Sequence, residues 1–213
     1  MARGIIFDHD DLLAETEPHH CSSTIEMLAH HGIPLTEKYY YEFWVKNGGD
    51  LADFVKQQGA TVDITQLRRE RRTLYHELLR KHLVPFNQSD IVVQTLHAHY
   101  PLAVASGSFS ADVRLSLQLM GIEHYFRTII TKDDVTKSKP DPEALHLAAQ
   151  RLHLAPTQLV VIDDAQKGIQ AAHAAGMKSI AIPTTRTQYH DFSLATIILG
   201  TIQDVTPELI SSI

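Results

Sequence analysis

The 213-residue sequence lacks the cysteines that a disulfide-stapled or zinc-binding protein would need. Its single cysteine, Cys21, excludes an intramolecular disulfide and fits a reducing cytosol. Cys21 follows His19 and His20, but no second cysteine or histidine group lies at a familiar zinc spacing. The histidines, 14 in all, are otherwise scattered, so we expect most of them on the surface.

The sequence also has no excess of basic residues and no long apolar run. Lysine and arginine number 19 against 25 acidic residues, a formal net charge of -6. The arginine-rich segment 68–72 contains Glu70, which indicates a solvated helix face and not a nucleic-acid surface. No apolar stretch approaches the length needed to cross a bilayer. Neither a nucleic acid nor a membrane is therefore expected as a partner.

What the chain contains is a change of pattern along its length. One buried strand is predicted at residues 3–8, and residues 16–83 then form a run of helices without a strand signal. The helices predicted in this run cover 17–32, 36–46, 51–58 and 63–82. From about residue 88, strands and helices alternate. The later strands are predicted at 102–105, 128–130, 159–162, 179–182 and 197–199, and the helices at 89–99, 110–120, 142–153, 167–175 and 206–212.

This alternation predicts an α/β fold, a parallel sheet with helices on both faces. The first strand must belong to the same sheet, so the helical run is an insertion after strand one. We therefore expect a discontinuous core domain, residues 1–15 and 84–213, and a helical domain at 16–83. Nothing in the sequence requires more than a monomer.

Polar side chains follow several of the predicted strands, at the point where each strand ends. Because parallel strands end at one edge of a sheet, where open α/β sheets bind ligands, these side chains are expected to converge. They are Asp8 with Asp10, Ser106 with Ser108, Lys139, and Asp163 with Asp164. Each group alone has an ordinary interpretation as a polar turn or a surface lysine. Their convergence favours a functional site.

The residue types suit phosphoryl transfer, which needs positive charge and hydrogen-bond donors around the phosphoryl oxygens. Asp8 can attack phosphorus or ligate a metal, and Asp10 can pass a proton to and from the leaving or attacking oxygen. Ser106 offers a hydroxyl and, with Gly107, backbone N–H groups to a phosphate oxygen. Lys139 can neutralise the repulsion between a carboxylate nucleophile and a phosphate.

The carboxylates also predict a metal ion. Asp8, Asp163 and Asp164 supply hard oxygen ligands, which suit Mg²⁺ with waters in the remaining positions. Carboxylates packed together would otherwise repel one another and raise some of their pKa values. A bound cation removes that cost. The site begins within a few residues of Met1, so a cleaved signal peptide would remove it, and we expect a cytoplasmic protein without one.

With these residues in view, the chain resembles the haloacid dehalogenase (HAD) superfamily, in the phosphatase and sugar-phosphomutase branch with a small helical cap after strand one. The resemblance covers nearly the whole chain, is specific for the core and is weak through the cap. It is carried by Phe7-Asp8-His9-Asp10, Ala105-Ser106-Gly107-Ser108, Lys139-Pro140-Asp141-Pro142-Glu143, Val161-Ile162-Asp163-Asp164 and the stretch Gly168–Met177.

The resemblance implies a Rossmann-like core and roles for the motif residues. Asp8 would be phosphorylated in a covalent intermediate, and Asp10 would protonate the leaving oxygen and then activate water. Ser106 and Lys139 would bind the phosphoryl group. Mg²⁺ would be held by Asp8, the backbone carbonyl of Asp10, and Asp164, with Asp163 assisting. The presence of Asp10 argues against a true dehalogenase, since those enzymes lack the second acid.

Four positions depart from the family pattern, one of them Glu15, which precedes Thr16 at the cap hinge where aspartate is usual. Asp11 stands where glycine is usual, so we expect it to adopt the same positive-φ turn while adding a negative charge near the site. His9 stands where an apolar residue is usual, and its side chain is expected to point away from the site. Ala165 replaces a usual serine or threonine. These changes are expected to affect catalytic efficiency more than the fold.

The cap would read the leaving group, and the candidate contacts are His20, Lys46 and Asn47. We expect a Mg²⁺-dependent phosphatase acting on a small phosphorylated metabolite such as a sugar phosphate. One alternative is a β-phosphoglucomutase-like isomerase, which shares every core residue named above. The other is a non-catalytic phosphate- or metabolite-binding protein, which Asp11 and Ala165 would favour.

Overall fold

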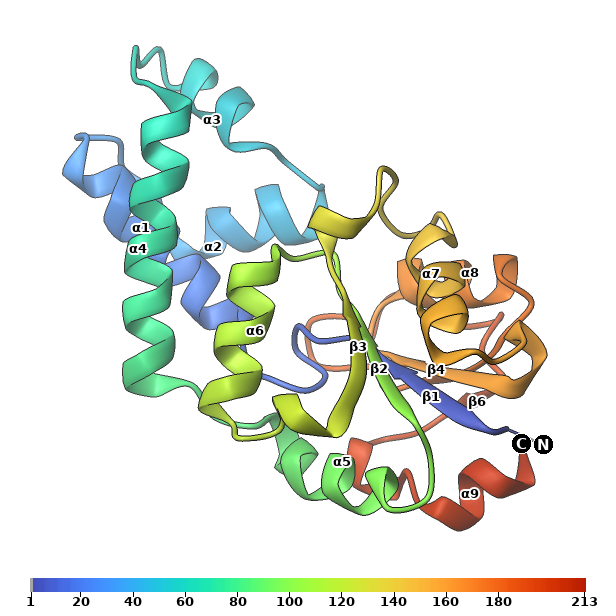
Figure 1. Ribbon diagram of the computed structural model, residues 1–213. Helices are drawn as coiled ribbons and strands as arrows, with labels where there is room; N and C mark the ends of the chain where they lie inside the picture. The colour runs from blue at the N-terminus through green and yellow to red at the C-terminus, as the bar shows by residue number, and fades with distance from the viewer. Residues whose placement is uncertain (1) are drawn as a thin grey trace. The chain divides into compact units, whose positions relative to one another are not determined.

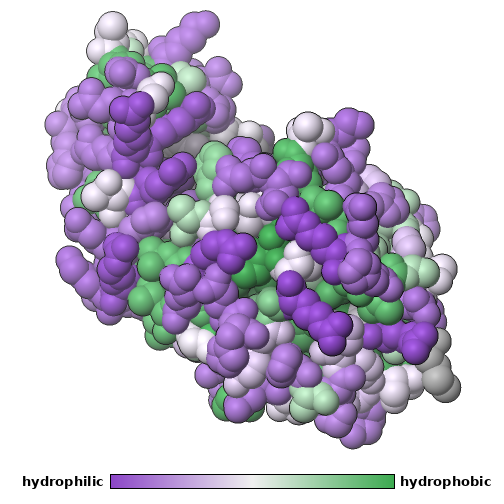
Figure 2. Space-filling view, viewed as in Figure 1, coloured by the Kyte–Doolittle hydropathy of each residue, from purple (hydrophilic) through white to green (hydrophobic). Residues whose placement is uncertain are grey.

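The computed structural model describes residues 2–213, which divide into two compact units. One contains the chain up to Glu15 together with Val84–Ile213, and the other is Thr16–Leu83. No helix within the described residues is both long and apolar enough to cross a membrane. In the view of Figure 2, hydrophilic side chains predominate and hydrophobic ones lie among them in separate patches.

The first unit is built on a six-stranded parallel sheet with the order β3-β2-β1-β4-β5-β6. Its strands are β1 (Gly4–Phe7), β2 (Leu102–Ala105), β3 (Phe126–Ile130), β4 (Leu159–Asp163), β5 (Lys178–Ala181) and β6 (Ile197–Ile198). The order along the sheet reverses between β1 and β4. Ligands of open α/β sheets bind beyond the carboxyl ends of the strands at such a reversal.

Helices cover both faces of this sheet (Figure 1). They are α5 (Ser89–His97), α6 (Ser110–Leu119), α7 (Glu143–Leu152), α8 (Gln166–Ala174) and α9 (Pro207–Ser212). Successive residues of β1 point to opposite faces: Ile5 and Phe7 pack in the hydrophobic cluster with α5, α6 and α9, and Ile6 packs in the cluster with α7 and α8. Because both faces of the sheet are buried at β1, this strand is an unbroken run of apolar residues. The predicted α/β fold is confirmed.

The second unit is helical and has its own core. Its helices are α1 (Glu17–His30), α2 (Glu37–Tyr40), α3 (Leu51–Gln57) and α4 (Ile64–His82). The side chains of Asp50 and Asp63 cap α3 and α4 by accepting hydrogen bonds from backbone N–H groups of the first turn. Met27, Phe54 and Leu67 are fully buried between these helices.

The predicted single helix over 36–46 is wrong in its second half, where Tyr41–Lys46 form a π-helix. The wider turn lets two adjacent rings reach one partner: the Phe43 and Trp44 centroids lie 5.7 Å and 5.0 Å from that of Phe54. The segment ends where the Gly48 and Gly49 N–H groups donate back to Trp44 and Phe43. Such a rearrangement depends on ring packing and leaves no periodic signal in the sequence.

Candidate active site

The register of the sheet places the first two carboxylates side by side. Phe7 of β1 pairs with Ile162 of β4, and the Asp8 N–H donates to the Ile162 carbonyl at 2.9 Å. Asp8 therefore leaves the sheet next to Asp163, the last residue of β4, and Asp164 follows directly. The structure brings together the residues that the strand-end argument predicted at this edge.

These three carboxylates form a buried cluster in which one oxygen atom of each lies within 4.8 Å of the others. Burial, opposed by Lys139 and reinforced by Asp163 and Asp10, raises the pKa of Asp8 to about 6. Burial, followed by the charges of Asp163 and Asp8, also holds the pKa of Asp164 well above its ordinary value. The cluster is costly as three anions, and carboxylate oxygens are the ligands that Mg²⁺ prefers. The donor set fits a magnesium ion.

Lys139 is the cation of the cluster. Its Nζ donates to Asp8 Oδ1 and to Asp163 Oδ2, each at 2.7 Å, and its side chain is only 6% exposed. Burial lowers the pKa of Lys139, but the charges of Asp163 and Asp8 outweigh it and raise the pKa overall. The loop that carries this lysine is fixed by Glu143, whose carboxylate accepts from the backbone N–H groups of Thr136 and Lys137. A permanently charged ammonium is therefore held against Asp8.

The Asp10 carboxylate is held by side chains on both of its oxygens. Oδ2 accepts from the hydroxyls of Ser108 at 2.7 Å and Ser106 at 3.2 Å, just beyond β2. Oδ1 lies 3.1 Å from His9 Nδ1. Between the serines, a β-carbon on Gly107 would meet no atom within 4 Å, so the backbone there is open to a ligand. Asp10 is thus aligned on the same edge as the buried cluster.

The expectation that His9 points away from the site is wrong, because its ring contacts the Asp10 carboxylate. His9 is fully buried, and its Nε2 hydrogen-bonds to Ser116 Oγ of α6 while its Nδ1 contacts Asp10. Burial lowers the pKa of His9, but the Asp10 carboxylate outweighs it and the pKa is raised. The partner on α6 lies 107 residues along the chain, so no local pattern predicted this bond.

The departures at positions 11 and 165 leave the site's framework intact. Asp11 has φ 55°, which confirms that aspartate adopts the turn expected of glycine, and its N–H donates to the Ala14 carbonyl at 2.8 Å. Ala165 lacks a hydroxyl, but its N–H donates to Asp163 Oδ1 at 2.9 Å. This bond to Asp163 comes from the backbone and does not depend on the side chain at position 165.

Gly168 of α8 contributes in a way that we did not predict from the sequence. A β-carbon there would lie 1.8 Å from Asp163 Oδ2 and 2.0 Å from its Cγ, so only glycine leaves room for this carboxylate. The signal was present, because a glycine in the first turn of a helix, soon after a buried aspartate, indicates a close approach.

His20 belongs to the helical unit, where it has partners of its own. Its ring stacks on Tyr75 with centroids 4.1 Å apart, and its Nδ1 lies 3.3 Å from Arg71 Nη1. These contacts orient the imidazole within the helical unit. Its contact with a substrate stays a prediction.

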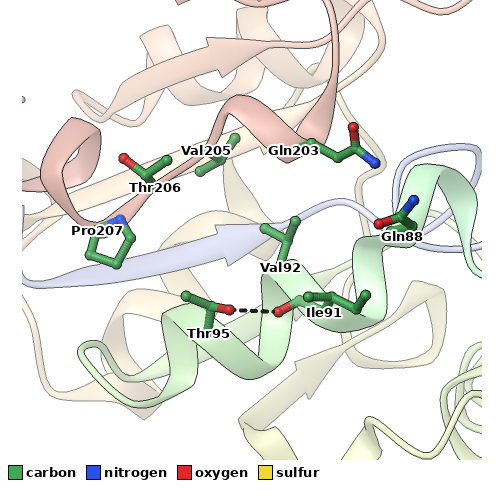
Figure 3. Close-up of a pocket in the computed structure, with 8 residues that line it drawn as sticks. All are labelled: Gln88, Ile91, Val92, Thr95, Gln203, Val205, Thr206 and Pro207. Carbon is green, nitrogen blue, oxygen red and sulfur yellow. Dashed lines mark hydrogen bonds between the residues drawn. The ribbon is translucent and has the colours of Figure 1, made fainter.

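A groove of about 500 Å³ lies on the first unit (Figure 3), and its lining residues are Gln88, Ile91, Val92, Thr95, Gln203, Val205, Thr206 and Pro207. Gln88 and Gln203 lie at one end, and Ile91, Val92 and Val205 supply apolar surface. None of its lining residues is charged or belongs to the carboxylate cluster. The groove offers no charge to a phosphate, so the candidate active site is the edge that carries Asp8.

Comparison with known proteins places this geometry in a family. Residues 5–182 match the model of the haloacid dehalogenase-like hydrolases. The chain belongs to this family. Its match spans both the sheet edge and the helical unit, so the resemblance seen in the motifs is confirmed.

Individual relatives agree with this assignment. The chain is 34% identical to the fructose-1-phosphate phosphatase YqaB of Escherichia coli strain K12, over 84% of this chain and 95% of the relative. It is 30% identical to a phosphoglycolate phosphatase of Pectobacterium atrosepticum, over 84% and 80%. A crystal structure of CbbY from Rhodobacter sphaeroides in complex with phosphate superposes with a TM-score of 0.83, at 26% identity and 96% coverage of each chain.

Proposed function

We propose that this hydrolase is a Mg²⁺-dependent phosphatase that hydrolyses a small phosphomonoester through an aspartyl-phosphate on Asp8. The observation that carries the proposal is the Lys139 ammonium bridging Asp8 and Asp163 at 2.7 Å, with Asp164 in the same buried cluster. A cation and a metal-type donor set around one carboxylate are what a nucleophile needs before it can approach a phosphate dianion.

In the first half-reaction, an Asp8 oxygen forms a bond to phosphorus while the bond from phosphorus to the leaving oxygen breaks. Asp10 donates a proton to that oxygen, so the alcohol departs neutral. Lys139, the Ser106 hydroxyl and the Gly107 N–H bind the phosphoryl oxygens. In the second half-reaction Asp10 takes a proton from a water that attacks phosphorus, and the bond between Asp8 and phosphorus breaks to release inorganic phosphate.

The residues that would hold Mg²⁺ are Asp8, the backbone carbonyl of Asp10, and Asp164, with Asp163 assisting. When bound, the ion would neutralise negative charge on the phosphoryl oxygens. The raised pKa values of Asp8 and Asp164 support this assignment, because both carboxylates gain from a cation.

The substrate class follows from the relatives, whose names specify fructose 1-phosphate and phosphoglycolate, both small phosphomonoesters. We infer a small phosphorylated metabolite of the sugar-phosphate type, with His20 of the helical unit as a contact to it. We expect the enzyme to work as a monomer in the cytoplasm, without nucleic-acid or membrane partners. The backbone hydrogen bonds that Asp11 and Ala165 donate keep the site's framework intact, which weighs against a non-catalytic binding role.

The test is phosphate release from a panel of sugar phosphates, nucleotides and glycolytic acids, with Mg²⁺ and with EDTA. Asp8→Asn is the control, because it keeps the side-chain shape and removes the nucleophile. Turnover that needs Mg²⁺ and disappears in Asp8→Asn supports the proposal. No release from any compound contradicts hydrolysis, and isomerisation of glucose 1-phosphate would then identify a mutase.

A further inference from the structure

A second ion pair lies beside the catalytic residues, and the proposed reaction does not use it. Arg186, in the loop after β5, donates from Nη1 to Asp11 Oδ2 at 2.9 Å. The two residues are 175 positions apart, and the Asp11 side chain is only 9% exposed. Asp11 directly follows Asp10, so this pair joins the catalytic loop to the loop beyond β5.

The loop that carries Arg186 also reaches the carboxylate cluster. Residues 184–187 form a turn in which the Thr187 N–H donates to the Thr184 carbonyl at 3.1 Å. The Thr184 N–H donates to Thr187 Oγ1 at 2.9 Å, and Thr187 Oγ1 lies 3.4 Å from Asp164 Oδ2. One turn therefore contacts Asp11 on one side and Asp164 on the other.

A carboxylate at position 11 is a liability for a phosphatase. It adds a negative charge directly after Asp10, within electrostatic reach of Asp164. A buried, unpaired carboxylate is also costly in itself, whereas a guanidinium offsets its charge and satisfies its oxygens. Arg186 is only 24% exposed in the pair, so solvent screens this interaction less than it would a surface pair.

We propose that Arg186 is a positioning residue which neutralises Asp11 and so allows a phosphoryl group to bind beside an additional carboxylate. The inference rests on the proposed phosphatase function. It explains how the chain tolerates aspartate in a turn where glycine would add no charge. A purely structural ion pair would stabilise the fold and leave phosphate affinity unaffected, which makes the two roles separable.

The test compares R186M, D11N/R186M and the wild-type chain by calorimetric titration with inorganic phosphate in saturating Mg²⁺, well below the melting temperature of each. Methionine keeps much of the apolar stem of arginine and removes its charge. R114M is the matched control, because it breaks another ion pair, in which Arg114 and Glu123 lie 2.7 Å apart. Glu123 lies in the turn before β3, at the end of that strand away from the active-site edge.

R186M is expected to weaken phosphate binding at least about fivefold, because the nearby Asp11 carboxylate loses the positive charge of Arg186. D11N/R186M should bind within about twofold of wild type, since the charge that needed compensation is gone. R114M should bind as wild type does. Equal phosphate affinity in R186M and wild type, or no recovery in D11N/R186M, would overturn the inference and leave the phosphatase proposal standing. Failure of the wild-type chain to bind phosphate would instead remove the proposed function and this inference with it.

Discussion

Replacing glycine by alanine in a helix ordinarily raises the free energy of unfolding. For Gly168→Ala the structure predicts that this free energy falls. Gly168 lies in the first turn of α8, at a φ that alanine can adopt. Its added β-carbon would lie 1.8 Å from Asp163 Oδ2 and 2.4 Å from Oδ1, whereas real β-carbons essentially never approach another atom within 3.0 Å. Asp163 must therefore move.

The magnitude follows from what Asp163 would lose. Its Oδ2 accepts from Lys139 at 2.7 Å and its Oδ1 from the Ala165 N–H at 2.9 Å. Hydrogen bonds to a charged group contribute about 1.5–3 kcal/mol each, against a gain of about 1 kcal/mol for replacing glycine by alanine in a helix. The free energy of unfolding should fall by about 2–5 kcal/mol, which lowers the melting temperature by roughly 5–15 °C in a chain of this size.

The assay is thermal and urea unfolding of Gly168→Ala, together with Mg²⁺-dependent phosphate release. Gly200→Ala is the matched control, because a β-carbon there meets nothing within 4 Å and the change should alter stability by less than about 1 kcal/mol. In an Asp163→Ala background, where the clashing atoms are absent, Gly168→Ala should become neutral or stabilising. A melting temperature at or above wild type for Gly168→Ala alone would refute the reasoning.

Three further predictions concern the same edge of the sheet. In EDTA and between pH 4 and 6, Asp8 keeps a proton in the folded state that it has released in the unfolded chain. Raising the pH through this window should therefore lower the free energy of unfolding by up to about 3 kcal/mol. Urea unfolding of wild type against Asp8→Asn measures this, and Mg²⁺ should abolish the slope; a slope shared by both proteins would contradict it. Lys139→Met leaves Asp8 and Asp163 without their shared cation, and we expect a loss of about 3–5 kcal/mol in urea unfolding, with no loss disproving a structural role for the ion pair. His9→Leu removes one of the groups that align Asp10, so kcat should fall roughly tenfold while KM stays unchanged. His9→Gln keeps an N–H donor, and its kcat should fall less. Equal kinetics in both variants would exclude alignment by hydrogen bonding.

The sheet and most of its edge could be predicted because their signals are local. An apolar run followed by Asp8 marks a buried strand and its end, and the same holds for the apolar run that ends at Asp163 in β4. The rule that parallel strands end at one edge then brings these residues together without knowledge of the strand order. Only the register, Phe7 beside Ile162, shows that Asp8 and Asp163 are neighbours close enough for one ammonium to bridge.

What could not be predicted depends on partners that are distant in the chain. His9 is held by Ser116 and Asp11 by Arg186, across 107 and 175 residues, and neither pair has a characteristic spacing. Both pairs involve positions where the chain departs from the family pattern, and in both the departure introduces a polar group that must be buried. Burying such a group is favourable only where a partner already lies within reach, so the substitution at position 11 and the arginine at position 186 are best understood as one feature. Asp11 weakens the motif when the motif is considered alone. Together with Arg186, it is compatible with an intact site.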